Sequence, residues 1–313
     1  MIEIIQQGIL TTIQGKQREG YRSLGISLTG GLDSLSLQLA NILVANTRDK
    51  AVLEITLGQF SAKFNVSTWI AITGAQTQIS LDEKKLSIGW CYPVKAGQTL
   101  TIDRPNIGMR NYLAVSGGFN AMEYLNSPST DLNTKLGGFN GRALEKGDIL
   151  TINSTSVCPK SIKGILLPTF KNQIRAIPAT EYSQFSKQSQ YDFWHNSWQL
   201  TTQSSRMGFR LSGSTLKRES SIDMMSHGVI PGVIQVPPNG QPIVLMQDAQ
   251  TTGGYPKFAC IIEADLNYLA QIRLGDLIQF KPCSLEEAYL VSQEQDIYLN
   301  KVERGLYENR FEC

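Results

Sequence analysis

Histidine is scarce in this chain of 313 residues, with His195 and His227 the only two. A metal site built from several histidines is therefore excluded, and no His-Glu-x-x-His pattern occurs. The five cysteines include no Cys-x-x-Cys pair, which argues against a disulfide framework and against a thiolate zinc site. Such cysteine usage is typical of a reducing compartment, so the sequence predicts a cytoplasmic protein without a bound metal.

An excess of charge is also missing, because 29 basic residues face 27 acidic ones and leave a net charge of +2. That balance gives no reason to expect nucleic acid or a membrane surface as a partner. The amino-terminal stretch carries an acid and no basic region, unlike a signal peptide. No apolar run approaches the ~20 residues that span a bilayer.

The common nucleotide-binding and nucleophile motifs are absent. There is no Gly-x-x-x-x-Gly-Lys-Ser/Thr, no Gly-x-Gly-x-x-Gly after a strand and no Gly-x-Ser-x-Gly. A P-loop, a dinucleotide-binding turn and a nucleophile elbow are therefore excluded.

Short apolar runs bounded by Gly, Pro, Asn or Asp are what the chain has instead. They lie at 51–57, 69–73, 112–115, 149–152, 233–236 and 243–246. Many short strands separated by turns are typical of β-barrels and β-sandwiches. The Pro-Pro-Asn-Gly sequence at 237–240 predicts a hairpin connection, since Asn-Gly readily adopts positive φ.

Helices are expected in only three places. Asp33 can cap a helix over 34–45, and Asp265 can cap a shorter one running to residue 272. Ser284 and Glu287 have capping-box spacing and predict a carboxyl-terminal helix. The charged stretch 301–313 is expected to fray.

A weak internal repeat predicts two units. The segment LEKGDIL at 144–150 resembles IRLGDLI at 272–278, each placing Gly-Asp in a turn before a strand, and KAGQTL at 95–100 is a looser copy. We therefore expect one β domain over 1–155 and a second over 156–313, the latter ending in the carboxyl-terminal helix.

The polar segment MQDAQTTGGYP at 246–256 is the strongest candidate for a site. It follows an apolar strand and offers hydrogen-bonding groups at nearly every position with a single carboxylate, Asp248. Arg206 and Arg210 alternate with apolar residues, so on one strand both side chains would project from the same face. Each feature could serve only turns or solvation. Together they indicate a cleft for a small polar or anionic substrate.

Several stretches resemble one protein family over nearly the whole length. They are GYRSLG at 20–25, GLD at 31–33, YLAVSGG at 112–118, STD at 129–131, LGG at 136–138, RMGFRL at 206–211 and the run from 228 to 256. The chain resembles the KipA/PxpC family, also called allophanate hydrolase subunit 2-like or biotin-dependent carboxyltransferase-like proteins.

This resemblance implies a mainly β protein with two tandem cyclophilin-like β-barrel domains and a few short helices. It also implies the C-type subunit of an ATP-dependent 5-oxoprolinase, active only in complex with a KipI/PxpB-type partner and a LamB/YcsF-type (PxpA) protein. Two alternatives stay open. One is the carboxyltransferase-type subunit of a urea carboxylase-like system. The other is a non-catalytic antagonist of a KipI-type kinase inhibitor.

A small planar amide such as 5-oxoproline is best bound by neutral hydrogen-bond donors and acceptors, which the polar segment can supply. Catalytic roles are expected for Asp248, Arg206 and Arg210, with a turn-forming role for Asp248 as the alternative. Substrate contacts are expected from Gln235, Gln250, Thr251, Thr252, Gly253, Gly254, Tyr255, Ser116, Gly117 and Gly118.

The chain departs from the family pattern in places. Ser205 stands where the family usually has Asp, and Gly15 and Gln17 stand where the family pattern Gln-Asp-x-Gly-Arg has Asp and Gly. No biotin-attachment motif is present, so this chain does not carry covalent biotin, and ATP would bind in a pocket shared with the partner. The aromatic residues 191, 193, 194 and 198 are either an exposed partner surface or, as we favour, part of a domain core.

Overall fold

The computed structural model describes residues 1–219 and 224–307, and the fold is mainly β, as expected. The chain divides into two compact units. The first unit comprises residues 1–18, 29–169 and 296–313, and the second comprises 19–28 and 170–295. The division near the middle therefore falls at 169/170, and each unit also takes in a segment from a remote part of the chain.

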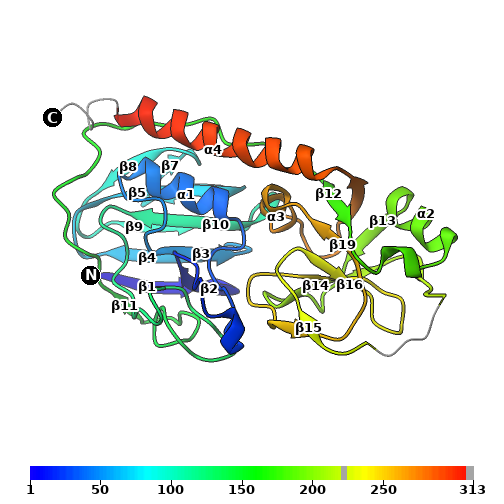
Figure 1. Cartoon of the computed structure of the whole chain (residues 1–313). Helices are drawn as coiled ribbons and strands as arrows, with labels where there is room; N and C mark the ends of the chain where they lie inside the picture. The colour runs from blue at the N-terminus through cyan, green and yellow to red at the C-terminus, as the bar shows by residue number, and fades with distance from the viewer. Residues whose placement is uncertain (220–223, 308–313) are drawn as a thin grey trace. The chain divides into compact units, whose positions relative to one another are not determined.

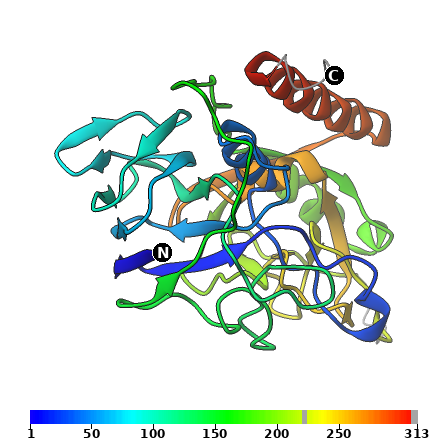
Figure 2. The same ribbon diagram turned by 90° about the vertical axis from the view of Figure 1, so that its left-hand side faces the viewer.

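The first unit contains two sheets (Figures 1 and 2). The six-stranded sheet has the order β11-β1-β4-β9-β6-β7 and the five-stranded sheet the order β2-β3-β10-β5-β8. A single apolar cluster draws Ile2, Ile4 and Phe60 from one sheet and Leu53 and Leu113 from the other. The strands are β1 Ile2–Gln7, β2 Leu10–Gln14, β3 Val52–Thr56, β4 Phe60–Phe64, β5 Thr68–Gln76, β6 Ile79–Leu81, β7 Lys84–Leu86, β8 Cys91–Val94, β9 Thr99–Ile102, β10 Ile107–Val115 and β11 Ile149–Leu150.

Helix α1 (Ser34–Leu43) begins where the sequence predicts, because the Asp33 carboxylate accepts hydrogen bonds from the Ser36 backbone N–H at 2.9 Å and its hydroxyl at 2.6 Å. Its leucines are buried on more than one face, Leu37 included. Leu299 and Leu306 from the end of α4 (Leu285–Tyr307) join the same apolar cluster. Both views show this end of α4 beside α1 (Figures 1 and 2).

The second unit contains a closed barrel of seven strands in the order β12-β19-β16-β17-β14-β13-β20. Phe193 and Trp198 are fully buried, which confirms the core interpretation for these two, whereas Tyr191 is 58% exposed and stacks on His195. The barrel strands are β12 Gln173–Pro178, β13 Ser197–Leu200, β14 Gly208–Ser212, β16 Val233–Gln235, β17 Ile243–Leu245, β19 Lys257–Ile261 and β20 Leu277–Pro282, and the short pair is β15 His227–Gly228 and β18 Thr252–Gly253. The remaining helices are η1 Arg22–Leu24, η2 Tyr182–Gln184, α2 Lys187–His195 and α3 Glu263–Leu269.

The predicted turns are present. Strands β16 and β17 pair antiparallel across the 237–240 connection, in which Gly240 has φ 73° and donates its N–H to the Pro237 carbonyl. Gly147 and Gly275 of the internal repeat both adopt positive φ, at 91° and 93°, just before β11 and β20. The repeat therefore marks the same turn in each unit.

The Asp265 cap is wrong, whereas the Ser284 cap is confirmed. Helix α3 begins three residues earlier, after Ile262, and the buried Asp265 carboxylate instead accepts bonds from the Arg175 backbone and guanidinium. Ser284 and Glu287 exchange the two bonds of a capping box. The helix they open continues to Tyr307, beyond the predicted start of fraying, and residues 308–313 lie outside the described part.

Candidate functional site

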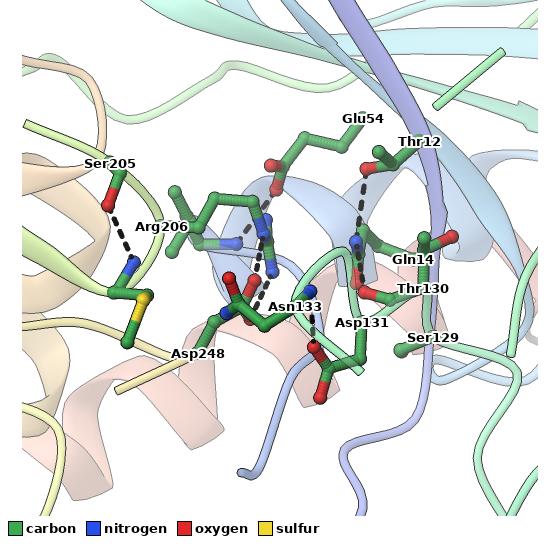
Figure 3. Close-up of polar contacts among 12 residues, drawn as sticks. Thr12, Gln14, Glu54, Ser129, Thr130, Asp131, Asn133, Ser205, Arg206 and Asp248 are labelled. Atoms are coloured by element: carbon green, nitrogen blue, oxygen red, sulfur yellow. Dashed lines mark hydrogen bonds and ion pairs between the residues drawn. The ribbon is translucent and has the colours of Figure 1, made fainter. Parts of the chain in front are cut away.

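Two of the predicted catalytic residues, Arg206 and Asp248, contact each other inside the second unit. Arg206 lies in the turn before β14 and Asp248 follows β17. Arg206 Nε donates to Asp248 Oδ2 at 2.8 Å, and Nη2 donates to Oδ1 at 3.0 Å. Figure 3 shows the guanidinium facing the carboxylate. A backbone bond from Asp248 N to Arg206 O at 3.0 Å joins the two loops as well.

Burial gives this ion pair its significance, since the side chains are only 5% and 1% exposed. Desolvating two charges is costly, and bidentate geometry offsets that cost best for an arginine and a carboxylate. The Asp248 carboxylate thereby fixes the direction of the guanidinium. It is a partner for another side chain, which the turn-forming alternative did not anticipate.

Gln247 is a functional candidate that the sequence alone did not single out. It is 6% exposed, and its Oε1 atom is buried without a hydrogen-bond partner. A buried acceptor left unsatisfied costs about 1–3 kcal/mol. Its position next to Asp248 in the polar segment was the available signal, but a carboxamide is less distinctive there than the single carboxylate.

The polar segment, expected to line a substrate cleft, runs from one end of β16 to the other. Strands β16 and β17 are antiparallel, so the start of β16 lies beside the end of β17, where Asp248 follows. The segment then runs back to the other end of β16, where Gln235 Nε2 donates to the Tyr255 carbonyl at 3.3 Å and Val236 N donates to the Pro256 carbonyl. The first residues of the segment therefore lie at one end of the barrel, and its last residues lie at the opposite end.

A cleft of about 790 Å³ lies at the second of these ends. Gly254 and Tyr255 line it, but Asp248, Arg206 and Arg210 do not. Gln235 is buried behind the segment, and a Cβ at Gly253 would lie 2.7 Å from its Nε2 atom. A side chain at 253 would therefore displace the Gln235 carboxamide. Gln250 and Thr252 are exposed and Thr251 is half-buried, with its carbonyl bonded to Val229 N.

Arg210 does not share a strand face with Arg206, which corrects the expectation of a shared face. Strand β14 begins only at Gly208, so the alternation does not extend back to Arg206. Along the strand Phe209 and Leu211 are buried while Arg210 is exposed. The two arginines therefore occupy different environments, one paired in the interior and one at the surface.

Ser116, Gly117 and Gly118, for which substrate contacts are expected, form a turn of the first unit. The Ser116 hydroxyl donates to the Val44 carbonyl, and Gly117 N donates to Asn46 Oδ1. Gly117 and Gly118 both have positive φ, and a Cβ at Gly117 would lie 2.2 Å from the Asn153 carbonyl. Backbone geometry explains the glycine pair without a ligand.

Arg22 is a second residue near the site that was not expected there from the sequence. Its Nη2 atom donates to the carbonyls of Val229 and Gln250 and so joins the polar segment to the loop that follows β15. Burial lowers the pKa of this guanidinium. The GYRSLG stretch at 20–25 is thus part of the second unit although it lies near the amino terminus.

The first unit has its own buried polar cluster. Arg18 is fully buried and donates from Nε to the Tyr124 carbonyl at 3.1 Å and from Nη2 to the Ser129 carbonyl at 3.0 Å. Gln14 Nε2 donates to Thr12 Oγ1 and to the Thr130 carbonyl (Figure 3), while its Oε1 atom is buried without a hydrogen-bond partner.

Other kinds of site find no support in residues 1–219 and 224–307. That part of the chain holds no group of three or more His, Cys, Asp or Glu side chains placed to hold a metal ion. It also holds no helix long and apolar enough to cross a membrane. Its four cysteines, at 91, 158, 260 and 283, are free thiols, and Cys313 lies outside it.

The barrel and the two sheets are those of a carboxyltransferase domain. The chain belongs to the family described as "Carboxyltransferase domain, subdomain A and B", whose model matches residues 24–282. It is 49% identical over 302 residues to the C-type subunit of 5-oxoprolinase from Escherichia coli K12, covering 96% of this chain and 97% of that protein. The corresponding 5-oxoprolinase subunit of Haemophilus influenzae is 43% identical over 97% of this chain and 98% of its own length.

Urea-processing enzymes are similar at lower identity. The urea amidolyase of Saccharomyces cerevisiae is 30% identical over 96% of this chain but only 18% of its own length. The crystal structure of the Kluyveromyces lactis urea carboxylase superposes with a TM-score of 0.90 at 28% identity, covering 97% of this chain and 29% of that one. This chain thus corresponds to less than a third of those larger enzymes.

Proposed function

We propose that this protein is the C-type subunit of an ATP-dependent 5-oxoprolinase, an amide hydrolase. The main support for this proposal is the 49% identity to such a 5-oxoprolinase subunit, over 97% of that relative's length. An alignment of nearly equal lengths at this identity supports a shared activity far better than a shared fold alone does.

The reaction opens a cyclic amide. ATP transfers its terminal phosphoryl group to the amide oxygen of 5-oxoproline and leaves as ADP. Water then adds to the activated carbon, the ring C–N bond breaks, and phosphate leaves, so that glutamate, ADP and phosphate are the products. Charge on the amide oxygen changes during this sequence, and preorganised donors aimed at that oxygen would stabilise it.

The Arg206–Asp248 pair and Gln247 supply chemistry of this kind. In the proposal, Arg206 faces the developing anionic oxygen, and Asp248 is a positioning residue that fixes the guanidinium. The unsatisfied Oε1 atom of Gln247 accepts the N–H of the ring amide, which would remove the cost of its burial. The segment that carries these groups is shaped by five further residues, Gln235, Gln250, Thr251, Thr252 and Gly253.

Partners complete the proposed enzyme. We assign a KipI/PxpB-type protein and a LamB/YcsF-type (PxpA) protein to the complex, because the relatives' own name is that of one subunit among several. The free thiols of the described cysteines fit a reducing compartment, so the proposal places the complex in the cytoplasm.

ADP release by the three proteins together, with and without 5-oxoproline, tests the proposal. We expect 5-oxoproline to stimulate ADP and glutamate formation only when this chain is present. Asp248→Asn and Arg206→Lys should each lower kcat by at least about tenfold, as expected when one oriented donor is lost. Asp276→Asn is a matched control, because it removes the carboxylate of an exposed Arg–Asp pair in the same unit.

Two results would reject parts of this assignment. A well-formed complex without 5-oxoproline-dependent ADP release would reject the activity. A large loss of kcat in Arg210→Ala, with Arg206→Lys unaffected, would move the site to the exposed face of β14.

Carboxyl transfer to a urea-type amide is the second candidate. It is favoured by the TM-score of 0.90 to a urea carboxylase. The lower identity to the urea enzymes ranks it second, and biotin-dependent carboxylation of urea in the presence of a carrier protein would be its test.

A further inference from the structure

The 790 Å³ cleft at the Tyr255 end of the barrel is of a size that small-molecule sites use, about 300–1,000 Å³. It lies away from the Arg206–Asp248 pair, since neither of those residues lines it. All of its lining residues belong to the second unit. The polar segment contributes one end to the ion pair and the other end to this cleft.

One part of the lining is apolar and presents flat surfaces. Pro237, Pro238 and Pro256 line it, together with the buried side chain of Val236. Tyr255 lines it too and is 46% exposed, although its backbone is held by Gln235. An exposed aromatic ring on a fixed backbone beside prolines suits stacking of a flat ring at little entropic cost.

Another part of the lining carries cations on a rigid backbone. Ser186 N donates to the Lys217 carbonyl at 3.0 Å, and Lys217 N donates to Ser189 Oγ at 2.7 Å. Arg218 forms a bridge with Phe185, and its Nε atom donates to Gln184 Oε1 at 3.0 Å. The Lys217 side chain is exposed. Among the described lining residues Glu219 is an acid beside Lys217 and Arg218, so these described residues keep a net positive charge.

These two surfaces together select a ligand that has both a flat apolar part and an anionic part. A wholly apolar ligand would leave the cations unused, and a simple anion would leave Tyr255 and the prolines uncovered. A nucleotide combines a planar base with phosphates. The chain contains no P-loop that would bind phosphates elsewhere.

We infer that this cleft binds an adenine nucleotide, with the base against Tyr255 and Pro237–Pro238 and the phosphates at Lys217 and Arg218. The choice of adenine rests on the proposed function, which consumes ATP. The inference goes beyond that function because it locates the nucleotide on this chain, at the opposite end of the barrel from the Arg206–Asp248 pair.

Calorimetric titration with three probes tests the inference, using the full chain alone and in complex with its partners. The probes are ATP, adenosine and inorganic tripolyphosphate. The Lys217→Ala/Arg218→Ala variant should lose at least tenfold in affinity for ATP and tripolyphosphate and keep its affinity for adenosine. Tyr255→Ala should show the converse, losing affinity for ATP and adenosine while binding tripolyphosphate as before.

Matched controls remove similar side chains of the same unit outside the cleft. Lys281→Ala removes an exposed cation, and Tyr289→Ala removes a tyrosine that is 65% exposed on α4. Both should bind all three probes like the unchanged protein. Circular dichroism melting of every variant checks that the barrel is intact.

The outcomes separate this inference from the proposed function. ATP binding that is absent, or is indifferent to both cleft variants, overturns the inference, and 5-oxoproline turnover that continues in those variants leaves the function standing. ATP binding that follows the predicted pattern, without turnover of 5-oxoproline, supports the inference and rejects the function. Binding of an acidic peptide in place of ATP would also overturn it.

Discussion

Each unit buries an arginine and an aspartate near one another, yet the two pairs are built differently. In the second unit Arg206 and Asp248 are joined by two hydrogen bonds. In the first unit Arg18 Nη1 and Asp131 Oδ2 are 3.8 Å apart. Arg18 is held mainly by backbone carbonyls, while Asp131 Oδ1 accepts the N–H groups of Asn133 and Thr134 in its own turn.

The turn-forming role considered for Asp248 is thus the role of Asp131. Both aspartates lie in stretches that carry the family resemblance, and both are almost fully buried. What distinguishes them is the partner of the carboxylate, which no local sequence pattern reveals. A carboxylate bonded to its own turn stabilises a loop, whereas one bonded to a guanidinium can also direct a charge at a ligand.

The largest expected effect is on the Arg206–Asp248 pair. Removing one partner takes two buried, charge-assisted hydrogen bonds away from the other, so Asp248→Asn and Arg206→Met should each lower the free energy of unfolding by about 3–5 kcal/mol. The double variant Arg206→Met/Asp248→Leu should lose less than the sum of the two single variants, because both substitutions remove the same two bonds. Guanidinium chloride unfolding followed by tryptophan fluorescence measures all three. Additive losses in the double variant would contradict a coupled pair.

Asp131→Asn should cost less, about 1 kcal/mol, because the asparagine oxygen can still accept the two N–H groups of the turn. The comparison predicts weak coupling to Arg18, since the two charged groups do not form a hydrogen-bonded pair. The same unfolding experiment measures this change. A loss equal to that of Asp248→Asn would show that the two pairs are equivalent after all.

The Gly-Asp turns of the internal repeat provide a milder comparison. Asp148 forms two bonds with the Arg142 guanidinium, at 2.7 and 2.8 Å, and its side chain is 12% exposed, whereas the Arg273–Asp276 pair is 43% and 46% exposed. Exposed pairs contribute about 0–1 kcal/mol, so Asp276→Asn should change stability by less than about 0.5 kcal/mol and Asp148→Asn by more.

At acidic pH, Asp148 should lose the stabilising effect that it has over asparagine at the same position. Its hydrogen bonds from Arg142 lower the pKa of this carboxyl. A lowered pKa in the folded state gives stability that is present above the unfolded value, about 3.9, and is lost as the pH falls through the folded value. The difference in unfolding free energy between Asp148→Asn and the unchanged protein should therefore shrink below about pH 4. A constant difference down to about pH 2 would assign the effect to packing.

The two helix caps compare a buried helix end with an exposed one. Asp33 is 2% exposed, whereas Ser284 caps the exposed start of α4. Ser284→Ala should cost about 0.5–1 kcal/mol and Asp33→Ala up to about 2 kcal/mol, because a buried helix end has no water to replace the lost acceptor. Thermal melting of the two variants measures the order, and equal melting temperatures would contradict it.

Local signals predicted several elements of the fold but missed helix α2 at Lys187–His195. The apolar runs became strands, Gly240 formed its turn, and the caps at Asp33 and Ser284 formed as their spacing indicates. The Asp265 cap failed because Arg175, 90 positions away, binds that carboxylate. A tertiary ion pair of this kind outweighs a local capping preference, and sequence spacing carries no trace of it.

The candidate site was predicted only in part for the same reason. The polar segment at 247–256 was identified from its composition, and two residues assigned to catalysis do meet. Its division between two ends of the barrel follows from the antiparallel pairing of β16 with β17, which depends on strand register. The alternation of polar and apolar residues also predicted that Arg206 lies on a strand, but β14 begins only at Gly208.

Helix α4 links the order of synthesis to the order of folding. The second unit ends at residue 295, whereas the first unit needs residues 296 onward, including Leu299 and Leu306, to complete the cluster around α1. A chain leaving the ribosome folds its earlier domains first when they are self-contained. Here the unit translated first is the last to be completed, because the cluster around α1 lacks Leu299 and Leu306 until the whole second unit has been made.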